Sequence, residues 1–543
     1  MKRILIILSF IATTIPMLLS QQQQFRWTPD DKLKYAERII SSYYVENVDR
    51  DTIVDEAIRA MLMTLDPHSV YSTPEETREL NEPLSGNFSG IGIKFNLIST
   101  DTLYVIETVA GGPAKKVGIQ PGDRIIQVND TVIAGVKMKN TEVMKKLRGP
   151  KGTVVNVKVQ RKGVPELIDF AITRDDIPIY SVESAYMADP TTGYILVTQF
   201  GENTPKEFAE ALAKLKKQGM KNLIIDLQSN GGGYLNAAYE LAANFLNKGD
   251  LLVYTDGPRI PSNVYKAEKD GSFPKDGRVV VLVDQYSASA SEILSGALQD
   301  HDRAAIVGRR TFGKGLVQRP FPFPDGSMIR LTTARYYTPS GRCIQKPYAK
   351  GKGEEYQLDM LNRYKSGELW SADSIHFDES LKCRTLNNGR TIYGGGGIMP
   401  DVFVAVDTTY YSPYYRDLVA KGVFNSFVLD HVEKNRKQLL KSYPTEDAFY
   451  ASFAVSPEME AALIAAAEKD EVPYNDEQWQ RSAPFVRAAL KGLMARDLYD
   501  NGSYVRSTNP LNPVYMEALR LVCDPERYNQ LINGSKRAFH KKS

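Results

Sequence analysis

Hydrophobic positions near the amino terminus recur with a helical period. Leu33, Ala36 and Ile39–Ile40 lie three or four residues apart, and the apolar positions of Ile53–Met61 repeat this spacing. A stripe of this kind marks one face of an amphipathic helix. We therefore predict an N-terminal helical region over residues 21–84.

The pattern changes at residue 85 to short apolar runs separated by glycine and proline. Runs broken in this way are typical of a small β-domain, which we place at residues 85–174. The expected elements are, in order, strands at 90–95 and 103–106, a short helix at 112–119, a turn at 121–123, a strand at 124–129, a helix at 141–147 and a strand at 153–160.

Strands and helices alternate over residues 175–405. Val279–Val283 is entirely apolar and Asn222–Leu227 largely so, as in strands that are buried on both faces. Amphipathic segments lie between such runs, and Pro205–Lys217 begins with a proline suited to the first helical turn. This order predicts a layered α/β core with parallel strands.

The last segment, residues 406–543, is aromatic at its start and mainly helical afterwards. It carries no recognisable chemistry and suits a packing domain, an oligomer interface or a docking surface equally well. The expected fold is therefore an α/β core with an inserted small β-domain and helical regions at both ends.

The first twenty residues have the pattern of a signal peptide. Lys2 and Arg3 precede the apolar run Ile4–Leu19, which is short for a membrane span. We expect residues 1–20 to direct export, so that the mature chain is periplasmic or otherwise extracytoplasmic. Because Leu18-Leu19-Ser20 is a poor cleavage site, an uncleaved segment that anchors the chain to a membrane is the alternative.

Composition and charge narrow the classes of partner. The net charge is +3 over 543 residues and no arginine-rich patch occurs, so no nucleic-acid partner is expected. Three cysteines, Cys343, Cys383 and Cys523, make neither a disulfide framework nor a zinc site. A Cys343–Cys383 pair and three buried free thiols both stay open. The five histidines have no metal-ligand spacing, and neither a metal nor a cofactor is expected.

Candidate chemistry lies where the buried run Val279–Val283 gives way to a helix. The small-residue cluster Ser287–Glu292 follows that run, and Lys314 then lies between two glycines, four residues before Gln318. A serine needs a base to act as a nucleophile at neutral pH, and a lysine of suppressed charge can be that base. A capping box, Ser289-x-x-Glu292, would explain the serine alone. The lysine confined by glycines favours a Ser–Lys hydrolase.

Such a hydrolase sets further requirements. A free lysine has a pKa of about 10.4, so a base that works near pH ~7.5 needs its pKa lowered by about 3 units. That shift corresponds to roughly 4 kcal/mol, which burial can supply. Gln318 would orient the neutral amine. Two N–H donors would stabilise the oxyanion, and we assign Ala290 and, from the Gly231–Gly233 run, Gly232. That run lacks the Gly-Lys-Ser/Thr ending of a phosphate loop.

The small β-domain resembles a PDZ domain. Its Pro113-Ala114 pair precedes a short helix, and Gly118-Ile119 precedes the turn Pro121–Asp123. The resemblance implies that a terminal carboxylate is held by backbone N–H groups and that the peptide pairs with the next strand edge. A β-domain that serves only as a spacer is the alternative. The residues expected to hold the peptide are Gly90, Ile91, Gly92 and Ile93.

Residues 50–405 resemble the C-terminal processing (tail-specific) peptidases. The matching blocks are Leu65-Asp66-Pro67-His68-Ser69, the PDZ segment, Asp226-Leu227-x-x-Asn230-x-Gly232-Gly233, Ser287-Ala288-Ser289-Ala290-Ser291-Glu292, Thr311-Phe312-Gly313-Lys314-Gly315-x-x-Gln318 and Gly396-Gly397-Ile398-x-Pro400-Asp401. The resemblance implies a crotonase- or ClpP-like protease core. It also implies that Ser289 is the nucleophile, Lys314 the base and Gln318 the residue that orients the base. The chain departs from the family at Gln228, usually arginine, and at Gly231, often proline.

The resemblance further implies the reaction and its substrates. We expect an exported serine endopeptidase that captures exposed, often apolar, C-terminal protein tails on its PDZ domain and cleaves through an acyl-enzyme. An adaptor or activating protein, and an oligomer, are compatible partners. The alternatives are an inactive PDZ adaptor on a protease fold and a hydrolase of small esters or amides.

Overall fold

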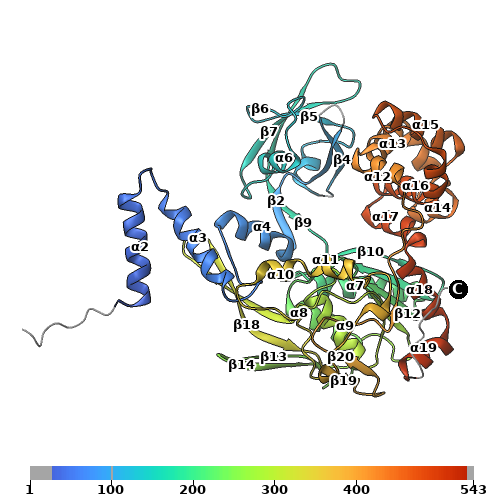
Figure 1. Ribbon diagram of the computed structural model, residues 1–543. Helices are drawn as coiled ribbons and strands as arrows, with labels where there is room; N and C mark the ends of the chain where they lie inside the picture. The colour runs from blue at the N-terminus through green and yellow to red at the C-terminus, as the bar shows by residue number, and fades with distance from the viewer. Residues whose placement is uncertain (1–26, 99–101, 110, 535–543) are drawn as a thin grey trace, which may run out of the picture.

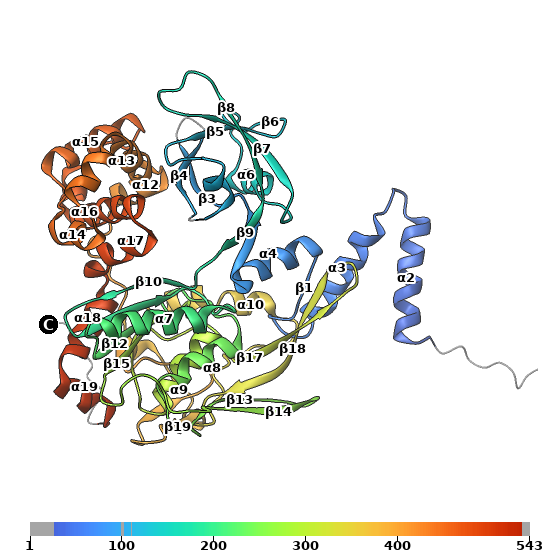
Figure 2. The ribbon, with the colours of Figure 1, turned by 180° about the vertical axis from the view of Figure 1, so that it is seen from behind.

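The computed structural model, which describes residues 27–98, 102–109 and 111–534, places two lobes side by side above a larger α/β body (Figures 1 and 2). One lobe is the small β-domain and the other is a bundle of C-terminal helices. The N-terminal helices extend to one side of the body. The predicted signal peptide, residues 1–20, lies outside the described residues.

A six-stranded sheet forms the centre of the α/β body. Its strand order is β10-β11-β12-β15-β16-β21, and every neighbouring pair is parallel except β10 and β11. This arrangement confirms the expected α/β core. The strands are β10 (Val182–Met187), β11 (Thr192–Val197), β12 (Asn222–Asp226), β15 (Val279–Val283), β16 (Ala305–Gly308) and β21 (Val402–Phe403).

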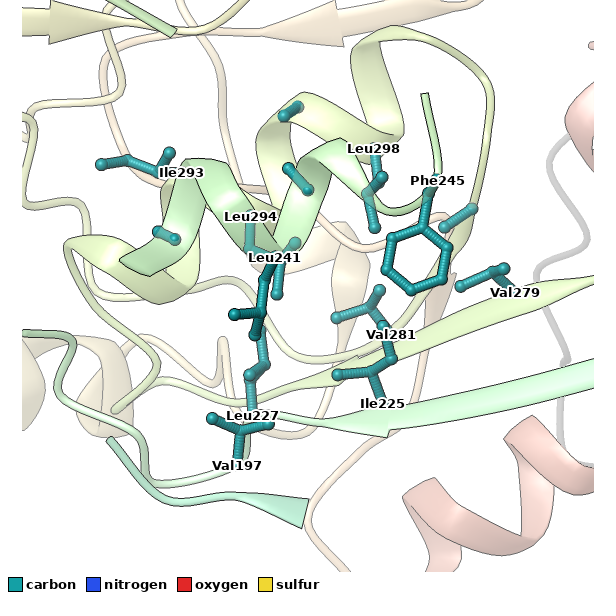
Figure 3. Close-up of a cluster of buried hydrophobic side chains, with 14 of the residues drawn as sticks. Val197, Ile225, Leu227, Leu241, Phe245, Val279, Val281, Ile293, Leu294 and Leu298 are labelled. Carbon is teal, nitrogen blue, oxygen red and sulfur yellow. The ribbon is translucent and has the colours of Figure 1, made fainter. Parts of the chain in front are cut away.

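Alternate side chains of the central strands pack on opposite faces, because a strand repeats every two residues. On β12, Leu223 and Ile225 belong to the cluster under the first helical layer, whereas Ile224 belongs to the cluster on the other face. Figure 3 shows the first of these clusters. The helices of its layer are α7 (Thr204–Lys217), α8 (Leu235–Ala243) and α9 (Ala290–Asp300).

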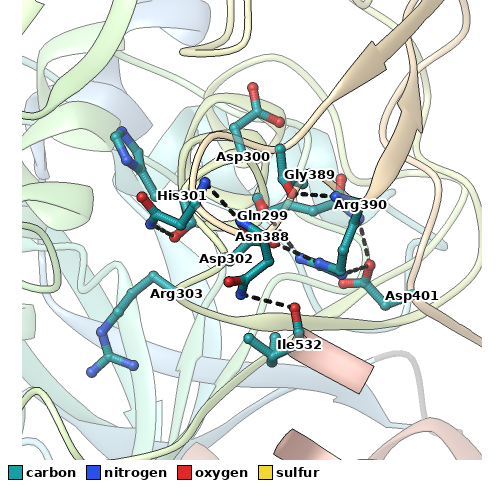
Figure 4. A network of polar contacts seen from close by, with 12 residues as sticks. Gln299, Asp300, His301, Asp302, Arg303, Asn388, Gly389, Arg390, Asp401 and Ile532 are labelled. Atoms are coloured by element: carbon teal, nitrogen blue, oxygen red, sulfur yellow. Dashed lines mark hydrogen bonds and ion pairs between the residues drawn. The ribbon is translucent and has the colours of Figure 1, made fainter. Parts of the chain in front are cut away.

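The last two helices among the described residues cover the opposite face of the sheet. They are α18 (Pro513–Cys523) and α19 (Pro525–Ile532). The end of α19 is tied to the body, since Asn388 donates to the Ile532 carbonyl at 3.0 Å within a polar network (Figure 4). Within that network, Arg390 pairs with Asp302 at 2.6 Å and with Asp401 at 2.5 Å.

The segment expected to be one C-terminal helical region therefore contributes to two bodies. Its first part forms the bundle lobe around a separate hydrophobic cluster, and its last two described helices belong to the α/β body. The helices of the bundle are α12 (Pro413–Ala420), α13 (Val423–Ser442), α14 (Glu446–Ser452), α15 (Pro457–Lys469) and α16 (Asp476–Leu498), and α17 (Asn501–Thr508) leads back to the body.

A second, antiparallel sheet lies beside the central one, with the order β1-β18-β13-β14 and β17 paired to β18. Its strands are β1 (Val70–Ser72), β13 (Leu251–Gly257), β14 (Ile260–Lys266), β17 (Leu316–Pro322) and β18 (Met328–Tyr337). Strand β1 lies in the region expected to be helical. The sequence pattern did not predict it, because its partner strand β18 is distant along the chain. The helices there are α2 (Pro29–Tyr43), α3 (Arg50–Met63) and α4 (Pro74–Ser85).

The small β-domain has the strand order β3-β4-β5-β7-β8, with β6 on β5, so β3 is an edge strand. Its elements are β3 (Ile93–Ile98), β4 (Thr102–Thr108), α5 (Pro113–Lys116), β5 (Arg124–Val128), β6 (Thr131–Val132), α6 (Asn140–Leu147), β7 (Val154–Gln160) and β8 (Ile168–Thr173). A two-stranded neck, β2 (Asn87–Gly90) with β9 (Asp175–Pro178), joins this domain to the body.

All three cysteines are free thiols, so the structure contains no Cys343–Cys383 bridge. Cys343 and Cys383 are half-buried and Cys523 is exposed. Among the described helices, none combines the length and the apolar character that a membrane crossing needs.

Candidate active site

Ser289 occupies a strained turn between β15 and α9. Its backbone has φ 54° and ψ −110°, values that a residue with a side chain rarely adopts. Strain of this kind persists only where the surroundings hold it, and it concentrates at functional sites. A sharp strand-to-helix turn raises the serine side chain above the carboxyl end of the strand, as in hydrolases that place their nucleophile on such an elbow.

The structure distinguishes the three serines of the cluster. Ser287 Oγ donates to the Leu227 carbonyl at 2.8 Å, and Ser291 Oγ donates to the Asn230 carbonyl at 2.8 Å, so both are buried ties to the neighbouring loop. Ser289 is half-buried, and its hydroxyl donates to no acceptor among the described residues. Only the middle serine is therefore free to react.

Lys314 lies in a loop whose two neighbouring positions, Gly313 and Gly315, leave no room for a side chain. Gly313 has φ +88°, and a Cβ there would lie 3.1 Å from both the Gly397 nitrogen and the Lys346 Cβ. A Cβ on Gly315 would lie 2.8 Å from the Gln345 nitrogen. The backbone around Lys314 is thus wedged between two other loops.

The charge of Lys314 is suppressed by its surroundings. Burial lowers the pKa of the Lys314 ammonium, and the positive charge of Arg330 lowers it further, against the opposing influence of Glu292 and Asp66. Lys314 Nζ donates to Gln318 Oε1 at 2.9 Å. Within the described part of the chain, no hydrogen bond joins Nζ to Ser289 Oγ.

Glu292 links the serine turn to the lysine loop. This fully buried carboxylate accepts four hydrogen bonds, from the N–H groups of Ser289 (2.8 Å), Gly313 (2.7 Å) and Lys314 (2.9 Å) and from Thr311 Oγ1 (2.5 Å). Burial nevertheless raises the pKa of Glu292. The sequence interpretation of Glu292 as a helix cap missed this second role, which the Ser-x-x-Glu spacing could not reveal.

Tyr336 of β18 makes a second link between the same two segments. Its hydroxyl donates to the Lys314 carbonyl at 2.7 Å and lies 3.1 Å from the Ser289 carbonyl. No local pattern marks this tyrosine in the sequence.

The turn Leu65–Ser69 also reaches the site. The side-chain amide of Gln318 donates to the His68 carbonyl, so His68 orients the residue that binds Lys314. Asp66 holds the turn by accepting from the N–H groups of His68 (2.8 Å) and Ser69 (2.9 Å). The His68 ring lies beside this site, and burial lowers the pKa of His68 to about 4.

The two predicted oxyanion donors lie next to each other. A Cβ on Gly232 would lie 2.8 Å from Ser289 Cβ and 3.0 Å from the Ala290 nitrogen. Ala290 N–H has no acceptor among the described residues, whereas Gly232 N–H donates to Asn230 Oδ1 at 2.9 Å. Gly232 can therefore serve an oxyanion only if it shares or releases that bond.

The candidate residues line one cavity of about 660 Å³. It lies between α4, the glycine loop and the strands β17 and β18. Its lining includes Leu80, Asn81, Gly232, Ser289, Lys314, Gln318 and Arg330.

The predicted peptide loop of the small β-domain lies between β2 and β3. The carbonyls of Ile91 and Gly92 accept from Ala114 N (2.8 Å) and Val109 N (2.9 Å), inside the domain. Since a trans peptide directs its N–H opposite to its C=O, the N–H groups of Gly92 and Ile93 point away from these partners. They are suited to a carboxylate at the start of the edge strand β3.

Family models match most of the chain. The model of peptidase family S41 matches residues 191–351, that of the PDZ domain matches 80–160, and that of the activating protease CtpB N-terminal domain matches 16–77. Residues 414–500 match a family of unknown function, DUF8443.

Curated relatives are similar over much of their length. Carboxy-terminal processing protease CtpA of Bacillus subtilis (strain 168) is 37% identical over 62% of this chain and 73% of its own, and CtpB of the same organism is 35% identical over 65% and 71%. A solved structure, the photosystem II D1 C-terminal processing protease, is 32% identical, covers 58% of this chain and 83% of its own, and has a TM-score of 0.33.

Proposed function

This chain belongs to the C-terminal processing peptidases, serine-type proteases that here carry a PDZ domain, and we propose that it cleaves with a Ser289–Lys314 dyad that Gln318 supports. One observation carries the proposal. The free hydroxyl of Ser289 and the charge-suppressed amine of Lys314 line the same cavity, while Glu292 binds both of their backbone segments.

The cleavage step follows from these groups. Ser289 Oγ attacks the peptide carbonyl carbon, and its proton passes to the lone pair of neutral Lys314 Nζ. One N–H of that amine is engaged by Gln318 Oε1, which leaves the lone pair free to turn toward the serine. Ala290 N–H, with Gly232 N–H, stabilises the oxyanion.

The intermediate then collapses in two stages. The Lys314 ammonium gives its proton to the leaving amine as the C–N bond breaks, which leaves an acyl-enzyme on Ser289. Lys314, neutral again, takes a proton from a water molecule that attacks the ester and returns it to Ser289 Oγ. Because no Ser289–Lys314 hydrogen bond is present among the described residues, the two groups must approach each other when substrate binds.

Substrate selection is assigned to the PDZ domain. A substrate's terminal carboxylate would bind the N–H groups of Gly92 and Ile93, and the preceding residues would pair with the free edge of β3. The unfolded segment upstream would then reach the cavity at Ser289.

The test is cleavage of an unfolded reporter protein with an apolar C-terminal tail. Ser289→Ala and Lys314→Ala are each expected to lower kcat by about 10⁴-fold or more. Ser289→Ala should still bind the tail with the affinity of the wild type. Ser287→Ala is the matched control, because it removes a buried structural hydroxyl and should lower stability while each folded molecule keeps cutting.

Two results would contradict the proposal. Undiminished cleavage by Ser289→Ala would place the nucleophile elsewhere. Tail binding by a wild type that cuts no reporter would favour the inactive adaptor instead.

We also propose that the chain is exported to the periplasm or another extracytoplasmic space. The support is the basic start, Lys2-Arg3, and the apolar run Ile4–Leu19. Cell fractionation, with N-terminal sequencing of the recovered protein, tests this. Recovery in the cytoplasm with residues 1–20 intact would exclude it.

A further inference from the structure

The bundle lobe faces the end of the PDZ groove where a bound tail would leave it. Resting on the tail capture proposed above, we propose that the bundle is a second wall of the peptide site and binds the substrate segment immediately upstream of the captured tail. The occupant is an extended polypeptide, recognised mainly through its backbone.

The two ends of the PDZ groove can be told apart from its contacts. The edge strand β3 and the helix α6 pack on the same core cluster, and we take the groove for the tail to lie between them. At one end the Arg148 guanidinium lies 4.4 Å from the centre of the Phe88 ring, and Gly149 N donates to the Ser89 carbonyl, so the end of α6 lies beside the carboxylate loop. The other end of the groove is therefore the end of β3 near Leu97 and the start of α6 at Asn140.

The direction of a bound tail follows from this geometry. Its carboxylate lies at the start of β3, so the peptide must run antiparallel to that strand, from Leu97 toward Ile93. A strand advances about 3.3 Å per residue, and roughly five residues of the tail therefore pair with Ile93–Leu97. The residue before them emerges beside Leu97 and Asn140.

A cavity of about 560 Å³ opens at that point, between the two lobes. Leu97 and Asn140 line it on the PDZ side. On the bundle side it is lined by the turn between α12 and α13, the start of α13 and the end of α15 with the residues that follow it. The bundle residues are Lys421, Gly422, Asn425, Ser426, Leu429 and 469–471.

The lining suits a peptide backbone better than a particular charge. Asn140 and Asn425 are exposed amides that can bind peptide groups, and Ser426 adds a hydroxyl. Asn425 Oδ1 already accepts from Arg496 at 3.5 Å, so Asn425 offers mainly its amide N–H groups as donors. Lys421 is already engaged, because its Nζ donates to the carbonyls of Asp470 (2.8 Å) and Glu471 (2.9 Å). The cavity thus offers polar groups without a strong net field.

The bundle and the PDZ domain also make contact outside the cavity lining. Lys162 of the PDZ domain pairs with Glu433 of α13 at 3.5 Å. Tyr104 of β4 is only 5% exposed, and burial, with the nearby Glu433 charge, raises the pKa of its hydroxyl to about 12. The bundle therefore packs against the domain that holds the tail.

The test compares two peptides that share the same four C-terminal residues, one of four residues and one of ten, on the full chain carrying Ser289→Ala. We expect the longer peptide to bind about tenfold more tightly. Asn425→Ala with Ser426→Ala should remove most of that gain and leave the affinity of the shorter peptide unchanged. Asp430→Ala is the matched control, since Asp430 is an exposed α13 residue outside the cavity that pairs with Lys434.

A photo-crosslinker gives a readout that does not depend on the variants. Placed at the seventh residue from the peptide's end, it should label residues 422–429, and placed at the third residue it should label the PDZ domain alone. Equal affinities of the two peptides, or labelling that never reaches the bundle, would overturn the inference while tail capture stands. If neither peptide bound, tail capture itself would fall, and this inference with it.

Discussion

Burial and the neighbouring charges together decide whether Lys314 can act as a base. Burial disfavours its ammonium form, and Arg330, which lines the same cavity, disfavours it further. Glu292 and Asp66 act in the opposite direction but are occupied by backbone and hydroxyl donors. The balance lowers the pKa of Lys314 and so raises the fraction of neutral amine near neutral pH.

Arg330→Gln should therefore move the pH dependence of cleavage. Loss of the positive charge raises the pKa of Lys314, so less of the amine is neutral at a given pH and the rising limb of kcat/KM shifts to higher pH. The measurement is a kcat/KM profile from pH 6 to 10. Arg319→Gln, at an exposed position on β17, is the control and should leave the limb in place. A shift to lower pH would contradict the assignment of Lys314 as the base.

Asp66→Asn tests the turn that positions Gln318. The amide keeps the size of the side chain, but one oxygen acceptor is replaced by an N–H donor. In the native protein Ser69 Oγ donates to Asp66 at 2.5 Å, and the new donor would face that hydroxyl. We expect kcat to fall about tenfold or more with a smaller change in KM, because the His68 carbonyl moves and Gln318 loses its anchor. A parallel fall in unfolding free energy without any fall in kcat of the folded enzyme would show a purely structural role.

At the scale of elements, the site is assembled where loops from separate strands touch. The glycine run after β12 lies against the turn after β15, and the lysine loop before β17 is tied to that turn through Glu292. Gly232 has φ +104° and no room for a side chain, whereas Gly231 faces open space. The two neighbouring glycines thus have different roles.

Gly232→Ala should lower kcat by at least about 10²-fold, because its Cβ would press on the Ala288 carbonyl and Ser289 Cβ and displace an oxyanion donor. Gly231→Ala, the matched control, should change kcat by no more than about threefold. The kcat of both variants is measured on the tailed reporter, and thermal melting gives the fraction of enzyme that is folded. Equal effects of the two variants would mean that contact with the serine turn is unimportant.

For the whole molecule, the protease body depends on the end of the chain. Helices α18 and α19 cover the face of the central sheet that α7, α8 and α9 leave free. Leu521 of α18 is fully buried in that layer. The residues that complete the fold thus lie more than two hundred positions after the proposed nucleophile.

Leu521→Ala should lower the free energy of unfolding by about 2–5 kcal/mol, the usual effect of a cavity left by a buried leucine. Denaturant unfolding followed by far-UV circular dichroism measures this. Arg520→Ala, whose side chain is 65% exposed, should change stability by less than about 0.5 kcal/mol. A loss below 1 kcal/mol for Leu521→Ala would mean that the body is stable without this layer.

Local patterns were enough to predict the α/β core and to select the candidate residues. Apolar runs such as Val279–Val283 indicate buried strands because a strand covered on both faces has no polar side. Ser289, Lys314 and Gln318 could be selected because a nucleophile, its base and the amide that orients the base each require a particular residue type. The PDZ segment could be placed because its turns require glycine and proline at fixed positions.

The tertiary structure alone decided what those residues touch. The four hydrogen bonds of Glu292, the tie from His68 to Gln318, the strand β1 and the return of α18 to the sheet all join segments that are distant along the chain. Periodicity reports which face of an element is buried, but it carries no information about the distant segment that buries it. Those pairings are selected by the packing of the whole chain, where each buried polar group must find a partner and each apolar face a cover.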